Sequence, residues 1–133
     1  MNYEVFKSDR YFTLFDINVS HGQLLIRSQK NGNAYNIDIV FFGTTYMQVN
    51  NRLSKISIKL IESKDNPIAY NTVKEYLTYK NSNLFQLESN GEVYYIIASF
   101  VRVFENELSF NETSLNHEEK GREKEIATSI ISL

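Results

Sequence analysis

Two glycine-containing dipeptides, ten residues apart, constrain the fold of this chain more than any other feature. His21-Gly22 and Asn31-Gly32 each lie between segments in which apolar and polar residues alternate. Gly adopts a left-handed backbone freely, and Asn and His do so more readily than most residues, so both dipeptides predict two-residue hairpin turns. The first turn would place Ile17 opposite Ile26, and the second would place Ile26 opposite Ile37. Because the two registers agree, they predict a three-strand antiparallel meander with one apolar face. That face would hold Phe15, Ile17, Val19, Leu24, Ile26, Tyr35, Ile37, Ile39 and Phe41.

The next segments extend the antiparallel pattern. A three-residue turn at 43–45 would pair Phe41 with Met47. Residues 54–61 alternate between apolar side chains and polar ones that include two lysines, which is typical of a solvated or edge strand.

A further hairpin is predicted around Asn90-Gly91, between residues 84–88 and 92–104. The second of these segments is apolar on both faces, which predicts a strand buried on both sides. A turn at Glu105-Asn106 would then allow a return strand that pairs Val103 with Leu108.

Two helices are predicted. Thr72 and Glu75 have the spacing of a capping box, which places a short helix within residues 62–83. Asn116 is followed three residues later by a glutamate, which indicates a second helix start. Residues 126–133 carry apolar side chains at helical spacing, so we expect a C-terminal helix that docks on the sheet. The alternative for these last residues is a final strand.

Together these elements predict a mainly β protein. The fold expected first is an antiparallel sandwich or partly open barrel of about seven to nine strands, with one short internal helix and a C-terminal helix. The second is a pleckstrin-homology-like barrel closed by the last helix. The length of 133 residues fits a single β-rich domain that spans residues 1–133.

Composition narrows the class of protein and its partners. With no cysteine, disulfides and thiolate zinc sites are excluded. The net charge is −2 and the basic residues are scattered, which argues against nucleic acid or a membrane surface as a partner. The N-terminus lacks a basic start followed by an apolar run, and no stretch approaches the roughly 20 apolar residues that cross a bilayer, so we expect a cytoplasmic protein. The abundance of Asn, Lys, Ile and Tyr resembles proteins of AT-rich bacterial genomes.

The predicted meander places mainly polar residues on the face opposite the apolar one. Asp16 would lie opposite Arg27, and Arg27 opposite Asn36, so that an exposed ion pair stabilises a solvated sheet face. The same rows form a candidate recognition surface. Its binding residues are Asp16, Asn18, Leu25, Arg27, Asn36 and Asp38, with Phe12, Val40 and Phe42 as apolar contacts at its ends.

No catalytic or metal-binding constellation is predicted. His21 lies at a hairpin tip, away from Asp16 and Asp38 along the strands, and His117 lies at a predicted helix start. Two His, no Cys and no spaced carboxylate set do not make a metal site. The sequence contains neither a nucleophile elbow nor a phosphate-cradling glycine-rich loop. We therefore expect no catalytic residue, no metal and no cofactor.

Three segments carry a resemblance to known proteins. SHGQLLIRS (20–28), YNIDIVFFGTTYM (35–47) and YYIIASFVRVFENELSF (94–110) form a pattern seen in small β-rich bacterial proteins, some similar to the immunity proteins of polymorphic toxin systems. This resemblance implies a non-catalytic protein whose partner is another protein, and it assigns no residue a role. The function expected first is a protein-binding module of immunity type. The alternative is a small-molecule or saccharide binder with a tyrosine-lined cleft, and a hydrolase comes third. The oligomeric state stays open.

Overall fold

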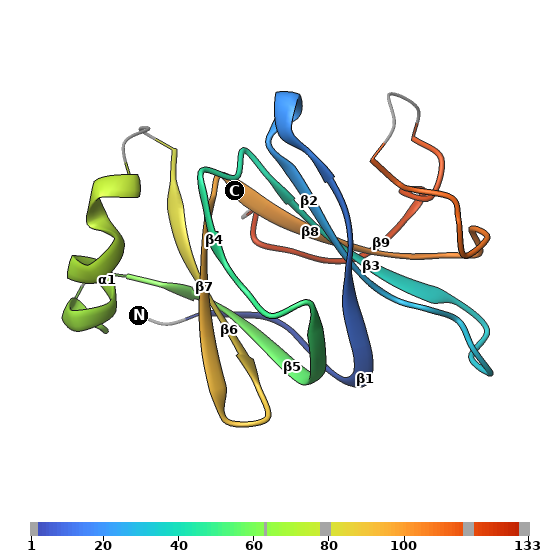
Figure 1. Ribbon diagram of the computed structural model, residues 1–133, viewed down its shortest axis with the longest axis horizontal. Coiled ribbons are helices and arrows are strands. Elements are labelled where there is room, and N and C mark those ends of the chain that lie inside the picture. The colour runs from blue at the N-terminus through green and yellow to red at the C-terminus, as the bar shows by residue number, and fades with distance from the viewer. Residues whose placement is uncertain (1–2, 63, 78–80, 116–118, 131–133) are drawn as a thin grey trace.

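The strands of the protein form one antiparallel sheet (Figure 1). The computed structural model describes residues 3–62, 64–77, 81–115 and 119–130. The strands are β1 (Tyr3–Asn18), β2 (Gln23–Ser28), β3 (Asn36–Phe42), β4 (Tyr46–Gln48), β5 (Arg52–Ile61), β6 (Asn83–Ser89), β7 (Glu92–Ala98), β8 (Phe100–Asn106) and β9 (Lys124–Thr128). Their order across the nine-stranded sheet is β4-β7-β6-β5-β1-β2-β3-β8-β9. The predicted mainly β, antiparallel fold class is thereby confirmed.

The sheet bends back over itself at two corners. At the first, β1 pairs with β5 as far as Thr13 and with β2 from Thr13 onward. At the second, the β3–β8 pair continues into the β4–β7 pair, and Ser99 N donates to Phe42 O at the join. Gly43 makes this join possible because its φ is +66° and an added Cβ would overlap the Ser99 hydroxyl. Strands that change neighbours at bends in this way produce a partly open barrel.

The inside of the bent sheet is one apolar core to which seven strands contribute. Phe41 of β3 and Phe85 of β6 meet edge to face there, with ring centroids 5.6 Å apart. β3 and β6 are far apart in the order of the sheet, so this contact crosses the interior. Five residues of the predicted apolar face are buried in this core: Leu24, Ile26, Ile37, Ile39 and Phe41.

Both hairpins of the meander are present, but their predicted registers are wrong by two residues. Ile17 pairs with Leu24 instead of Ile26, and Ile26 pairs with Ile39 instead of Ile37. The cause is that both loops are longer than two residues: the first contains a 3-10 turn, η1 (Val19–His21), and the second spans residues 29–35. A shift by two residues keeps every side chain of β2 and β3 on its predicted face, because side chains alternate along a strand.

A bulge in β1 overturns the prediction for the end of that strand. The register of β1 against β2 slips between Leu14 and Asp16. As a result Phe15 packs in a separate cluster, outside the main core. Ile17 and Val19 lie beyond the bulge and are 44% and 86% exposed instead of buried.

The hairpin predicted around Asn90-Gly91 is confirmed, since β6 and β7 pair with Ser89 opposite Glu92. Both turn residues have positive φ, 49° and 80°. The long strand predicted over 92–104 is divided at Ser99 into β7 and β8, which have different neighbours.

Two predicted strand pairings and one predicted strand position are wrong. Met47 pairs with Ile96 of β7 instead of Phe41. The strand predicted over 54–61 is present as β5 and lies between β1 and β6, so the edge alternative is wrong. The solvated alternative is right, because Lys55 is exposed and Lys59 is half-buried. The partner of β8 on its outer side is β9, with Val103 opposite Ala127, and Leu108 lies in a loop.

The helices also differ from the prediction. Residues 124–128 form β9, so the C-terminal helix is wrong there and the alternative of a final strand is right. Residues 116–118, which include His117, and residues 131–133 lie outside the described part of the chain.

The internal helix is present as α1 (Pro67–Val73), followed by a 3-10 turn, η2 (Lys74–Tyr76). Asn66 caps α1, so the predicted capping box that starts at Thr72 is wrong. Across the described residues, no helix has the length and apolar character needed to span a bilayer.

Candidate functional site

Four of the six predicted binding residues are buried. Leu25, Arg27, Asn36 and Asp38 have no exposed surface. They lie beneath the covering segment, which we define as residues 107–115 and 119–123 and which crosses this face of β2, β3 and β8. The solvated face expected from the sequence is therefore covered.

The other two residues lie at the margin of the covered face. Asp16 is half-buried, and its Oδ2 accepts a hydrogen bond of 2.7 Å from the Thr113 hydroxyl. Asn18 is half-buried, and its side chain caps η1 by accepting from His21 N. His21 lies in this turn, as predicted.

The three apolar residues predicted at the ends of this surface do not share one place. Phe12 is buried in the main core, on the opposite face. Val40 is buried with Leu25 and Phe104 under the covering segment. Phe42 stacks on Phe100, with ring centroids 4.8 Å apart.

A bidentate ion pair holds the covering segment in place. Arg27 Nε and Nη2 donate to the two carboxylate oxygens of Asp38 over 2.6 Å and 2.8 Å. Asp38 Oδ2 also accepts from Asn106 Nδ2 (2.9 Å) and from Ser114 Oγ (2.7 Å), while Arg27 Nη1 donates to Glu112 O. A buried ion pair is stable only when hydrogen bonds satisfy its remaining atoms, and these contacts supply them. The predicted ion pair between Arg27 and Asp16 is wrong, because the register shift between β1 and β2 places Asp16 opposite Leu25.

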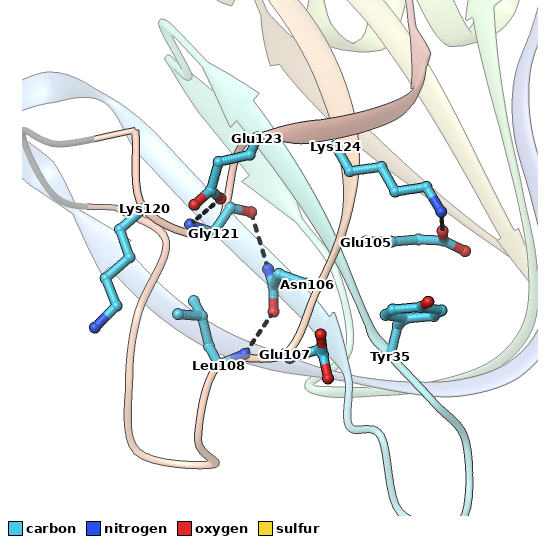
Figure 2. Close-up of a pocket in the computed structure, with 9 residues that line it drawn as sticks. All are labelled: Tyr35, Glu105, Asn106, Glu107, Leu108, Lys120, Gly121, Glu123 and Lys124. Atoms are coloured by element: carbon cyan, nitrogen blue, oxygen red, sulfur yellow. Dashed lines mark hydrogen bonds and ion pairs between the residues drawn. The ribbon is translucent and has the colours of Figure 1, made fainter.

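A pocket of about 360 Å³ lies where the end of the covering segment meets β8 (Figure 2). Lys124 Nζ lies 2.8 Å from Glu105 Oε1 and 5.1 Å from the centroid of the Tyr35 ring. The hydrogen bond and charge of Glu105 raise the pKa of Lys124. Asn106 Nδ2 donates to Gly121 O over 3.0 Å. In Figure 2 the first of these contacts joins β9 to β8, and the second joins the covering segment to β8, so the pocket lies at a structural junction between them.

A slit lies between β4 and the second half of β1. Two backbone hydrogen bonds close its ends, from Thr44 N to Gly22 O (2.8 Å) and from Leu14 N to Asn51 O (2.9 Å). In the described part of the chain, β4 pairs with β7 alone, and β5 leaves β1 at Thr13. The middle of the slit therefore has a strand edge without a strand partner on each side.

The described residues that line the slit are uncharged and expose mostly apolar surface, and the volume of the slit is about 220 Å³. Val19 is 86% exposed, Ile17 is 44% exposed and Met47 is 36% exposed. The lining residues are Ile17, Asn18, Val19, Gly22, Gln23, Leu24, Thr44, Thr45, Tyr46 and Met47. Neighbouring exposed apolar side chains of this kind mark interaction sites. Sequence reasoning missed this site because it assigned Ile17 and Val19 to the core.

The two outer strands of the sheet differ in charge. Lys124 and Glu125 of β9 pair with Glu105 (2.8 Å) and Arg102 (2.5 Å) of β8. β4, Tyr46–Gln48, contains no charged residue and no proline. Natural sheets protect their outer edges from unwanted pairing with charges, prolines or bulges. β4 is therefore the outer edge that is chemically suited to accept another strand.

Comparisons with known proteins found no match: no family model matches the chain, and neither do curated proteins or solved structures.

Proposed function

We propose that this protein is a protein-binding module and that an extended segment of its partner enters the slit beside β4. The observation that carries the proposal is the uncharged edge of β4, which faces a second unpaired strand stretch across an apolar groove. A strand added there would form main-chain hydrogen bonds, which supply affinity, while its side chains select the partner by their fit to the groove.

The expected affinity follows from the groove. Full burial of a Val, Ile or Met side chain contributes about 1.5–3 kcal/mol to binding. The slit offers three such side chains: Val19 is largely exposed, whereas Ile17 and Met47 are already partly buried and would contribute less. Association costs about 4–15 kcal/mol because the two proteins lose translational and rotational freedom. The apolar contacts alone do not offset this cost, so the main-chain hydrogen bonds must contribute as well. We expect a Kd in the micromolar range, which corresponds to about −8 kcal/mol.

The class of partner proposed first is a toxin domain. It rests on the resemblance of three segments to immunity proteins and on the mild negative charge of the chain. The product of a neighbouring gene is the first protein to test. A partner of another kind would leave the binding proposal intact and remove only the toxin assignment.

The test is titration of the purified partner against the protein and two single variants. Val19→Asp places a charge in the slit, and we expect it to weaken binding at least tenfold. Ile68→Asp is the matched control, because Ile68 is 82% exposed on α1 and lies outside the slit. It should change the Kd less than twofold.

Amide hydrogen exchange adds a measurement of how the partner binds. Strand addition should slow exchange of amides in β4 when the partner is present. Equal losses in both variants, or unchanged exchange in residues 46–48, would contradict the proposal, and so would the absence of any partner that binds at micromolar strength.

A further inference from the structure

Arg10 carries a charge that no carboxylate contacts within the described residues. Its Nε donates to Ser28 Oγ (2.9 Å), and its Nη2 donates to the backbone oxygens of Ser28 (3.2 Å), Gln29 (3.0 Å) and Tyr35 (2.9 Å). All four acceptors are neutral. Within the same part of the chain, Nη1 donates no hydrogen bond. The guanidinium is thus held in a fixed orientation with donor capacity left over.

The backbone of β1 brings Arg10 to this position. The register of β1 against β5 slips between Ser8 and Tyr11, and Arg10 lies in that irregular stretch. Its side chain reaches the loop between β2 and β3, at residues 29–35, whose carbonyl oxygens it binds.

Beside Arg10 lies a cavity of about 250 Å³ whose lining, among the residues that the structure describes, contains no Asp or Glu. Tyr11, Thr13, Asn31 and Asn33 contribute hydroxyl and amide groups to it. Arg27 also reaches the lining, but its charge is neutralised by Asp38. In a chain with a net charge of −2, a cavity lined by cationic and neutral hydrogen-bonding groups stands out.

Partial burial makes the charged form of Arg10 less stable than it is in water. Loss of water around the guanidinium lowers the pKa of Arg10, and the attraction of Glu105 opposes this shift without cancelling it. The Glu105 carboxylate is itself engaged by Lys124 at 2.8 Å. An anion in the cavity would supply the missing opposite charge.

We infer that this cavity is a binding site for a small oxyanion, a phosphate or a carboxylate group. A guanidinium forms charge-assisted hydrogen bonds with both groups, and its planar fork fits their oxygens. The cavity is smaller than the roughly 300–1,000 Å³ of sites for drug-sized ligands, so it takes a small anion or the anionic end of a larger ligand. The site is separate from the slit, so this inference does not depend on the proposed function.

The test is a titration with inorganic phosphate and, separately, with acetate, at constant ionic strength. A ligand that binds only the folded state raises the melting temperature along a saturating curve. We expect saturation for at least one of the two anions, and comparison of the two midpoints tells phosphate from carboxylate. A melting temperature that does not change, or that rises without saturation as with any salt, would overturn the inference.

Three variants locate the site. Asn33→Asp adds a like charge at the cavity, and we expect it to weaken anion binding about tenfold. Asn81→Asp adds the same charge at an exposed position outside the cavity lining, and the midpoint should stay within twofold. Arg10→Gln should abolish binding. Because Arg10 also anchors a loop, Asn33→Asp is the decisive variant: equal midpoints for Asn33→Asp and Asn81→Asp would place the anion elsewhere.

Discussion

Replacing Asp38 by Asn tests whether the covering segment seals the polar face of the sheet. The substitution keeps the shape of the side chain but removes its charge, and it leaves the Arg27 guanidinium without a counter-charge. Both side chains have no exposed surface. Removing one partner of a buried ion pair costs about 3–5 kcal/mol because the remaining charge stays desolvated.

The loss should be large relative to the whole stability. Domains of this size unfold with about 5–15 kcal/mol. With an unfolding entropy of about 2.1 cal/mol/K per residue, a loss of about 3–5 kcal/mol in a chain of 133 residues lowers the melting temperature by about 11–18 °C.

The assay is urea unfolding of the protein, of Asp38→Asn and of Glu125→Gln. Glu125 forms an ion pair with Arg102 at 2.5 Å, but the two side chains are 34% and 29% exposed. Water screens such a pair, so its loss should cost less than about 1 kcal/mol. Equal losses in the two variants would refute the reasoning, because they would mean that water reaches Arg27 beneath the covering segment.

Three further predictions test local features of the fold. Gly43→Ala should lower the free energy of unfolding by about 3 kcal/mol, because the alanine would have a left-handed backbone and its Cβ would overlap Ser99. Gly32→Ala has a left-handed backbone but open space around it, so the loss should be about 1 kcal/mol, and urea midpoints compare the two variants. Hydrogen bonds, first from a lysine ammonium and then from a backbone amide, lower the pKa of Glu112 from 4.5 to about 2. Its stabilising contribution is therefore present above pH 4.5 and lost as the pH falls toward 2, and Glu112→Gln should remove this part of the acid dependence of the urea midpoint. Asn66→Ala should cost about 1 kcal/mol because it removes the cap of α1, whereas Thr72→Ala should cost less than about 0.5 kcal/mol; thermal unfolding distinguishes them.

Local chemistry was sufficient to predict most of the strands and one complete hairpin. Asn90-Gly91 forms a two-residue turn because both residues tolerate positive φ, and that preference needs no distant contact. The apolar faces of β2 and β3 were also predicted correctly, since the register error was an even number of residues.

The neighbours of the strands were decided by the tertiary structure. Residues 126–133 have helical spacing of apolar side chains, yet residues 124–128 form β9 because the outer edge of β8 offers backbone hydrogen-bond partners. The bulge between Leu14 and Asp16 likewise changes which side chains reach the core. Neither the bulge nor the free edge of β8 is visible in the local pattern.

The candidate sites show the same division. The sequence identified Arg27 and Asp38 as members of a polar face, but their burial depends on residues such as Ser114, which follows Asp38 by 76 positions. The slit exists because β4 pairs with β7 and leaves its other edge open. Turn and strand preferences act between residues that are close in the chain. Burial, edge pairing and neutralisation of charge depend on segments that meet only in the folded protein, and so they had to be read from the structure.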